Sequence, residues 1–212
     1  MEIIQHLVDE HKDVARLISN LDQLLSESPS SWDLAHLNLL MNFIPVFVEQ
    51  LHHGKEEDIL FPLLAENPAL NQGGPQCTFF MGMKLNRDPV NPIFDVMGRP
   101  ATKHPKVMID QILKNQSPLR IPIEEHQAGA AAIYFLKSRL QQNLVDETFA
   151  RMLQNYRQLL QSHMDKENKC LFILATEALP LKVREQAYEQ VRDFEKNIPM
   201  DIVHEGLKAL KS

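Results

Sequence analysis

Histidine and glutamate residues at helical spacing form two pairs in this chain, and both residue types can bind metal ions. His52 and Glu56 make one pair, and His163 and Glu167 make the other. Residues four apart lie about 40° from each other around an α-helix, so each pair can face one ion. Imidazole and carboxylate without thiolate suit iron, manganese, zinc or copper. Two helices that each supply one such pair are therefore expected to meet at a metal site.

The two pairs lie in near-copies of one segment. HGKEEDILF, which begins at His53, corresponds to HMDKENKCLF, which begins at His163, and the closing Leu-Phe sets Glu56 over Glu167. A single pair at this spacing can simply be a surface ion pair worth roughly a few tenths of a kcal/mol. The repetition favours a metal site over that alternative.

A second repeated segment adds one histidine to each half. EHKDVARLI begins at Glu10 and EHQAGAAAI begins at Glu125, so His11 and His126 precede the two pairs. The intervals of 41 and 37 residues that follow are each long enough for a helix, a turn and a returning helix, which predicts two helical hairpins. The groups that would then converge are sufficient for two ions bridged by the glutamates: His11, His52, Glu56, His126, His163 and Glu167.

Several neighbouring residues are alternatives or additions to this set. His53 and Glu57 have the same spacing but are turned by about 100° around the helix, and the alignment of the two halves disfavours them. Tyr156 and Tyr134 could point to the same interior, where hydrogen bonding to a ligand and ordinary core packing are equal alternatives. The remaining histidines are expected at the surface: His6, His36, His104 and His204.

These residues resemble the hemerythrin-like, or HHE cation-binding, domains of the bacterial type. The family has a single His on helices one and three and His-x-x-x-Glu on helices two and four, and HHGKEEDILFP, from His52 to Pro62, is similar to its second-helix motif. The oxygen carriers of the family have a fifth histidine on helix three, where this chain has Ala130 or Pro122. They also carry an aspartate on helix four, where this chain has Asn168.

The resemblance implies a cofactor and a range of functions. It implies two non-haem irons bridged by carboxylates, with manganese or zinc as the less favoured metals. With four histidines, more coordination positions stay open than in the carriers, for a small ligand such as O2, NO or peroxide. The first hypothesis is a protein that binds or senses oxygen. The alternatives are defence against peroxide or NO, iron-centre repair, an iron-responsive sensor module and a metal-free bundle. Whether the protein is an enzyme stays open.

The implied fold is all-α, an up-down-up-down four-helix bundle with additions. The bundle helices are expected at about 3–26, 32–64, 123–142 and 146–178, the second capped by Ser31 and bent near Pro45 and Gly54. A connection over 67–122, rich in proline, is expected to pack as a cap or a lid, and a C-terminal helical extension covers 180–212. We expect one domain over 1–212.

Composition excludes some classes of partner. The net charge is -6 and no Lys/Arg cluster occurs, which argues against nucleic acid. No signal peptide and no long uncharged apolar window is present, so we expect a cytoplasmic protein without a membrane partner; protein partners are not readable. Cys77 and Cys170 are far apart in sequence, and a structural disulfide between them is not expected.

Overall fold

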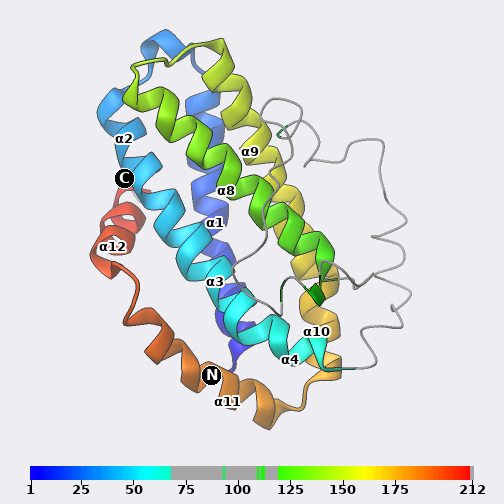
Figure 1. The fold of residues 1–212 in the computed structure, drawn as a ribbon. Helices are drawn as coiled ribbons and strands as arrows, with labels where there is room; N and C mark the ends of the chain where they lie inside the picture. Colours follow the sequence, from blue (N-terminus) through cyan, green and yellow to red (C-terminus); the bar gives the residue numbers. More distant parts are fainter. Residues whose placement is uncertain (68–92, 94–108, 110, 113–118, 211–212) are drawn as a thin grey trace.

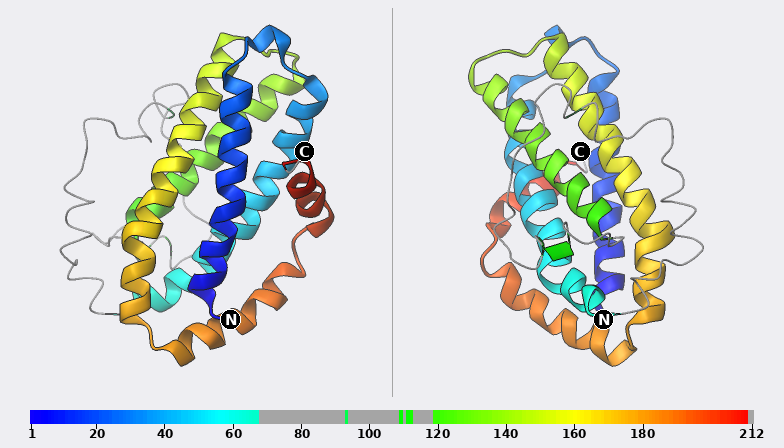
Figure 2. Two further views of the ribbon diagram at one scale, coloured as in Figure 1. Left: turned by 180° about the vertical axis from the view of Figure 1, so that it is seen from behind. Right: turned by 45° about the vertical axis from the view of Figure 1, so that its right-hand side comes forward.

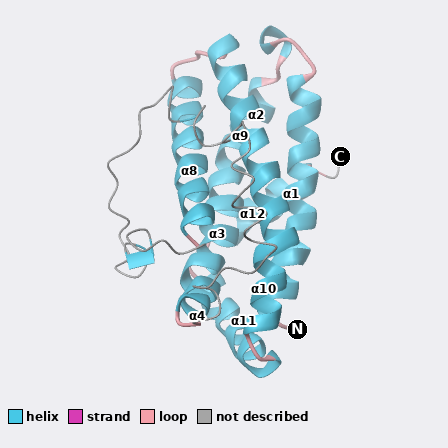
Figure 3. Ribbon diagram, turned by 90° about the vertical axis from the view of Figure 1, so that its right-hand side faces the viewer, coloured by secondary structure: helices cyan, strands magenta, loops and turns pink. Residues whose placement is uncertain are grey.

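All regular structure in the described part of the chain is helical, as the sequence predicted (Figure 3). The computed structural model describes residues 1–67, 93, 109, 111–112 and 119–210. The α-helices among them are α1 (Ile3–Leu25), α2 (Leu34–Ile44), α3 (His53–Lys55), α4 (Phe61–Ala65), α8 (Arg120–Gln141), α9 (Glu147–Lys166), α10 (Phe172–Ala178), α11 (Leu181–Glu195) and α12 (Met200–Ala209).

The long helices lie side by side and form the body of the molecule (Figures 1 and 2). α1 packs along α9, and α8 packs along both α9 and α2. The stretch from α2 to α4 is one continuous helical rod, and α9 and α10 form another. Each of these two rods follows a single long helix, α1 or α8, so the chain forms two helical hairpins that pack together.

Three wide, π-helical stretches interrupt the two rods. They are η2 (Pro45–His52), η3 (Glu56–Leu60) and η5 (Glu167–Leu171). Pro45 opens the first of them because proline has no N–H to close the regular helical hydrogen bond. π-helical turns are rare and occur frequently at functional sites. The irregularity expected near Pro45 and Gly54 is therefore present, as wide turns on both sides of Gly54.

The first rod begins two residues later than the sequence predicted. Its N-cap is Asp33, whose carboxylate accepts from the backbone N–H of Ala35 at 2.9 Å. Ser31, the expected cap, belongs instead to a 3₁₀ turn that Pro29 begins, and its hydroxyl donates to the carbonyl of Ser28 at 2.7 Å. The prediction of Ser31 was wrong because its hydroxyl is committed to that turn.

The buried side chains form two apolar clusters with a polar layer between them. Along α1, Leu7 belongs to one cluster, Val14 belongs to the other, and His11 lies between them. In the connection predicted over 67–122, the described residues include three isoleucines that are buried in these clusters: Ile93, Ile109 and Ile112. The choice between cap and lid falls on residues outside the described part of the chain.

The C-terminal helices cross the outside of the body (Figures 1 and 2). α11 packs against α1 and η3, and α12 packs against α2 and η2. Both contacts use a glycine: a Cβ at Gly54 would lie 2.7 Å from the ring of Phe194, and one at Gly206 would lie 2.0 Å from the ring of Phe43. The absence of a side chain at these positions permits the close approach.

One stretch, Leu34–Ala65, is long and apolar enough to cross a membrane by length and composition. Half of the apolar window is buried inside the molecule, and the same stretch places His52 and Glu56 in the interior. Core helices of soluble proteins share these properties, so the stretch is weak support for a membrane span.

Candidate metal centre

The structure brings all six predicted residues together in the polar layer between the two apolar clusters. Each is at least nine-tenths buried, with exposures of 4% or less: His11, His52, Glu56, His126, His163 and Glu167. Ionisable groups at this depth are costly to bury unless they are paired or bind metal. Their convergence from four helices is what the repeated spacing predicted.

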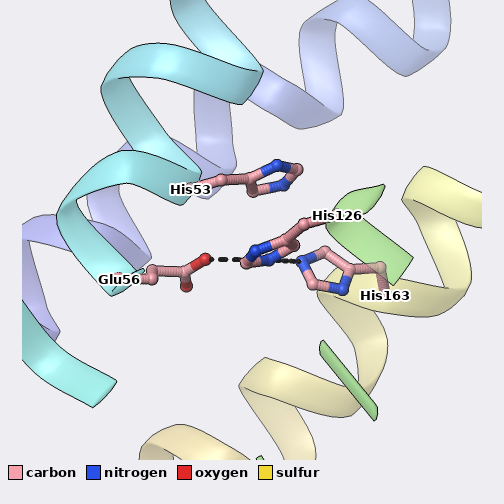
Figure 4. Close-up of side chains that lie close together, drawn as sticks. All are labelled: His53, Glu56, His126 and His163. Atoms are coloured by element: carbon pink, nitrogen blue, oxygen red, sulfur yellow. Dashed lines mark hydrogen bonds and ion pairs between the residues drawn. The ribbon is translucent and has the colours of Figure 1, made fainter. Parts of the chain in front are cut away.

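The buried groups form two clusters that share a carboxylate, and in each cluster the potential ligand atoms lie within 4.8 Å of one another. The first cluster comprises His11, His52, Glu56 and Glu167. The second cluster comprises His53, Glu56, His126 and His163. Figure 4 shows these four side chains converging, His53 and Glu56 from the first rod, His126 from α8 and His163 from α9. Two neighbouring ion positions bridged by Glu56 would account for this arrangement.

The imidazole nitrogens in each cluster face each other at the separation of two ligands on one ion. Nε2 of His11 lies 3.0 Å from Nε2 of His52, and Nε2 of His126 lies 3.2 Å from Nε2 of His163. Two nitrogens that each bind one ion at about 2.1 Å and at a right angle lie about 3.0 Å apart. The spacing therefore fits a shared ion as well as it fits a hydrogen bond.

Glu167 also lies between the two clusters. Its Oε2 is 3.3 Å from Nε2 of His11 and 3.2 Å from Nε2 of His163. Glu56 is placed in the mirror-image way, with Oε2 3.3 Å from Nε2 of His126 and Oε1 3.9 Å from Nε2 of His52. Each carboxylate thus faces one histidine of each hairpin, which is the position of a bridging ligand.

Unpaired buried atoms show that the residues fit a bound cation. Both carboxylate oxygens of Glu56 and of Glu167, and Nε2 of His53, have no hydrogen-bond partner within the described residues. A buried carboxylate oxygen without a partner is costly, and a divalent cation would satisfy several of these atoms at once. The donor set of imidazoles and carboxylates suits iron, manganese or zinc.

An outer carboxylate holds one histidine of each hairpin in the orientation that a metal ligand needs. Nδ1–H of His52 donates to Glu10 at 3.0 Å, and Nδ1–H of His163 donates to Glu125 at 3.0 Å. Because each Nδ1 carries the proton, Nε2 keeps its lone pair for the interior. A lysine in turn donates to each of these carboxylates: Lys55 to Glu10 and Lys166 to Glu125.

The other two predicted histidines are held by the opposite hairpin. Nδ1–H of His11 donates to Asn168 Oδ1 at 2.9 Å, and Nδ1–H of His126 donates to Glu57 at 2.9 Å. Asn168 and Glu57 each follow a bridging glutamate in the repeat. Glu57, an alternative ligand from the sequence, therefore lies outside the two clusters and contacts the back of a histidine.

His53, which the alignment disfavoured, lies inside the second cluster. Its ring stacks on that of His126, with centroids 3.7 Å apart, and its Nδ1–H donates to Glu49 at 3.1 Å. The alignment failed at this position because the second half has Met164 there, so the repeat offers no counterpart. The centre therefore gathers five histidines, and the residue missing from α8 is replaced by one from the first rod.

Of the two tyrosines, only Tyr156 points inward. It is 1% exposed, and the space left by Gly129 holds both its ring and the carboxylate of Glu49. Burial, together with the charge of Glu49, raises the pKa of Tyr156 well above its usual value. Tyr134 is 74% exposed and takes no part.

The two glutamates that lie between the histidine clusters differ in their affinity for a proton. Burial raises the pKa of Glu56 well above its usual value, and the facing charge of Glu167 raises it further. Burial acts in the same direction on Glu167, but His163 and His11 outweigh it, so the pKa of Glu167 lies below its usual value. A cation between them favours the ionised form of both, so metal binding should release a proton from Glu56.

His52 is neutral at physiological pH in this environment. Burial lowers its pKa to about 4, although the hydrogen bond to Glu10 acts in the opposite direction. A neutral imidazole is the form that binds metal. The pKa of Glu10 lies well below its usual value because His52, His6 and Lys55 together outweigh burial, so Glu10 stays ionised and keeps its hydrogen bond to His52.

The structure also accounts for most of the remaining cysteines and histidines. His36 lies near the surface with Nε2 2.9 Å from Asn20, and His204 is exposed, as predicted. His6 is half-buried, with a side-chain exposure of 19%. His104 and Cys77 lie outside the described residues.

Cys170 departs from its prediction. It is 4% exposed and disulfide-bonded, which corrects the expectation that no structural disulfide is formed. That expectation rested on distance along the sequence, which does not limit how closely two thiols approach in a folded chain.

Comparison with known proteins gives one family match, and it lies over the first hairpin. Residues 2–75 match the family described as the hemerythrin HHE cation binding domain. The match spans α1 to α4 and therefore includes three of the six predicted residues: His11, His52 and Glu56. The chain thus carries a hemerythrin HHE match, as the sequence resemblance predicted, and the second hairpin extends beyond it. Neither the curated proteins nor the solved structures gave a match.

Proposed function

We propose that this protein is a cytoplasmic hemerythrin-like protein that binds two iron ions and uses them to bind or sense O2. In this proposal the two hairpins form a single-domain, up-down-up-down four-helix bundle around the centre. The observation that carries it is the sharing of Glu56 and Glu167 between two histidine clusters, because two carboxylates between two ion positions are typical of di-iron and di-manganese bundles.

The fifth histidine makes the two proposed ion positions unequal. With His53, the second position has three histidines and the first has two, His11 and His52. The first position therefore has fewer protein ligands and more room for a small molecule. Iron supplies the redox chemistry and the affinity for O2, NO or peroxide. The residues described above orient the imidazoles, keep Nε2 free of protons and exclude water from both carboxylates.

The protein environment suits a ligand that is small and uncharged. The side chains that surround the polar layer are buried apolar groups, and the ring of Phe172 stacks on His11 at 5.2 Å between centroids. A dry apolar surrounding favours a diatomic molecule over a charged metabolite. Defence against peroxide or NO uses the same centre and is the second candidate function; iron-centre repair and iron sensing have no separate support from the geometry.

The test is the metal content and visible spectrum of anaerobically purified protein, recorded before O2 is admitted, after it, and again after its removal. We expect about two irons per chain and an absorption band that appears with O2 and disappears on its removal. An irreversible change would transfer support to the reaction with peroxide or NO. Absence of stoichiometric metal would overturn both proposals.

A further inference from the structure

Lys55 is a fully buried cation with an unusual set of partners. Its side chain is 0% exposed, and Nζ lies 2.5 Å from Glu10 Oε1, 2.7 Å from Glu195 Oε1 and 2.9 Å from His6 Nε2. These three partners come from α1 and from α11. Lysine is almost never fully buried unless it is paired, so two carboxylates and an imidazole explain how this ammonium can be stable there.

The same three partners are spaced like a third metal cluster, but the ammonium takes the place of an ion. Glu10, Glu195 and His6 have ligand atoms within 4.8 Å of one another. Nζ of Lys55 lies within hydrogen-bond distance of all three, so the positive charge that this cluster needs is already part of the chain. The cluster is therefore a structural link between α11 and the metal centre.

The second hairpin contains the matched comparison. Lys166 occupies the position of Lys55 in the repeat and donates to Glu125 as Lys55 does to Glu10, but its side chain is 24% exposed. Glu125 is the only ion-pair partner of Lys166 among the described residues. Water can accept the remaining hydrogen bonds of the Lys166 ammonium. Lys55 is covered by α11, so Glu195 takes the place of water as an acceptor.

Close packing holds α11 in this place. Phe194 fills the space above Gly54, and the ring of Tyr188 lies 5.3 Å from that of His6. Glu195 is the last residue of α11 and follows Phe194 directly. The contacts that dock the helix are therefore next to the carboxylate that reaches Lys55.

We infer that Glu195 is a positioning residue for the metal centre: through Lys55 and Glu10 it fixes the ring of His52, so that docking of α11 controls one of the two ion positions. The chain of contacts runs from Glu195 to Lys55, to Glu10 and to Nδ1–H of His52. It ends in the cluster of His11 and His52. In the second hairpin the chain from Lys166 to Glu125 and His163 is present, but among the described residues no second carboxylate pairs with Lys166. That Nε2 of His52 binds a metal rests on the proposed function; the control of its ring by Glu195 does not.

The first test follows the ring N–H of His52 by NMR in the full-length chain, loaded with Zn²⁺ as a diamagnetic probe and again after chelation. We expect Glu195→Gln to make the Nδ1–H of His52 exchange with solvent roughly tenfold faster. This is the lower end of the roughly 10- to 100-fold loss of metal affinity that typically follows when a metal-ligating histidine loses its partner. The Nδ1–H of His163 should be unaffected. Asp193→Asn, a loss of the same charge on the exposed face of α11, is the matched control and should change neither histidine.

A double-mutant cycle separates positioning from general stability. If Glu195 acts through Lys55, Glu195→Gln should have no further effect in a Lys55→Gln background, and Glu195→Asp should restore part of the protection. Equal acceleration at His52 and His163, or the same effect from Asp193→Asn, would overturn the inference. Because the chelated sample needs no metal, this result holds even if the protein proves to bind none.

The second test uses iron release to a chelator in the holo-protein. Glu10→Gln and Glu125→Gln should each accelerate release from one of the two positions and so identify the two kinetic phases. Glu195→Gln should accelerate, by a few-fold to tenfold, the phase that Glu10→Gln accelerates and leave the other unchanged. Acceleration of the Glu125→Gln phase, or of neither phase, would contradict the inference.

Discussion

The two helical hairpins present similar residues to the centre but surround them differently. Glu10, His52 and Lys55 in the first hairpin match Glu125, His163 and Lys166 in the second, with the same hydrogen bonds. The first hairpin also has His53, and its lysine is covered by α11. Two identical hairpins would give two equal candidate ion positions, and these differences make the two candidate positions unequal.

Each hairpin contributes one glutamate that contacts a histidine of the other hairpin. Glu56 contacts His126 of the second hairpin, and Glu167 contacts His11 of the first. A change in either hairpin therefore reaches both ion positions through the carboxylates, whereas a change in the outer partners should stay local. Substitutions that separate shared from local effects test this comparison directly.

Glu56→Gln should have the largest effect, because Glu56 is the residue common to both clusters. We expect metal content to fall from about two ions per chain to nearly none, since a neutral amide is a poor bridge between two cations. Metal analysis of the purified variant measures this. Glu185→Gln on α11, a charge loss at an exposed position, is the control.

The same variant should be more stable than the wild type when both are metal-free. Burial holds the pKa of Glu56 above its unfolded value of 4.5, so its ionisation destabilises the fold as the pH rises toward and through the raised pKa. Glutamine resembles the neutral form. The gain in melting temperature should be absent near about pH 4 and grow toward about pH 8; a gain that is independent of pH would contradict the assigned cause.

His53→Gln should remove one ion position and preserve the other. His53 belongs only to the cluster of His126 and His163, so we expect about one metal ion per chain instead of about two. Atomic absorption together with the visible spectrum would detect the loss of the coupled pair. His204→Gln, at an exposed histidine, should keep both ions, and full metal content in His53→Gln would remove His53 from the site.

Substituting either outer partner, Glu57 or Asn168, should have a smaller effect that is confined to one position. Glu57 accepts from His126, and Asn168 accepts from His11. Because Glu57 is a carboxylate and Asn168 a neutral amide, His126 should be a stronger donor to a metal than His11. We expect Asn168→Asp to slow metal release from the His11 position and Glu57→Gln to accelerate release from the His126 position, each by roughly tenfold. Equal effects on both release phases would show that the partners are not local.

Tyr156→Phe should have the smallest effect. The hydroxyl faces the carboxylate of Glu49, whose charge raises the pKa of Tyr156, and its removal should change the free energy of unfolding by less than about 1.5 kcal/mol. Metal content should stay the same, while the spectrum should shift slightly because Glu49 supports His53. Loss of metal in this variant would mean that Tyr156 holds Glu49 in place.

The sequence predicted the hairpins and the six converging residues because repetition carries information that a single motif does not. His11 and His126 would have been unremarkable alone, but their place before each pair fixed their role in the fold. The outer residues Glu10 and Lys55 were visible in the same repeated letters, since Glu-His and Lys-Glu recur in both halves. The repeat alone does not assign them a role, because Glu10 has no histidine partner at the four-residue spacing and lysine is not a metal ligand of this kind.

Other features had no local signal. His53 was disfavoured by the very alignment that found its neighbours, because a residue that makes the halves unequal has no copy to support it. Glu195 lies more than a hundred residues from its lysine, and only the docking of α11 brings them together. The wide turns η2 and η3 could be expected as an irregularity near Pro45 and Gly54, whereas nothing comparable precedes η5 in the second hairpin.

The wide helical turns have a consequence for the length of the chain. Insertion of one further helical residue inside Pro45–His52, Glu56–Leu60 or Glu167–Leu171 would leave the helix continuous. Side chains on the two sides of the change would be turned relative to each other by about 100°, away from their shared target. These stretches should therefore accept many changes of residue type on their outer faces but almost no change in residue number.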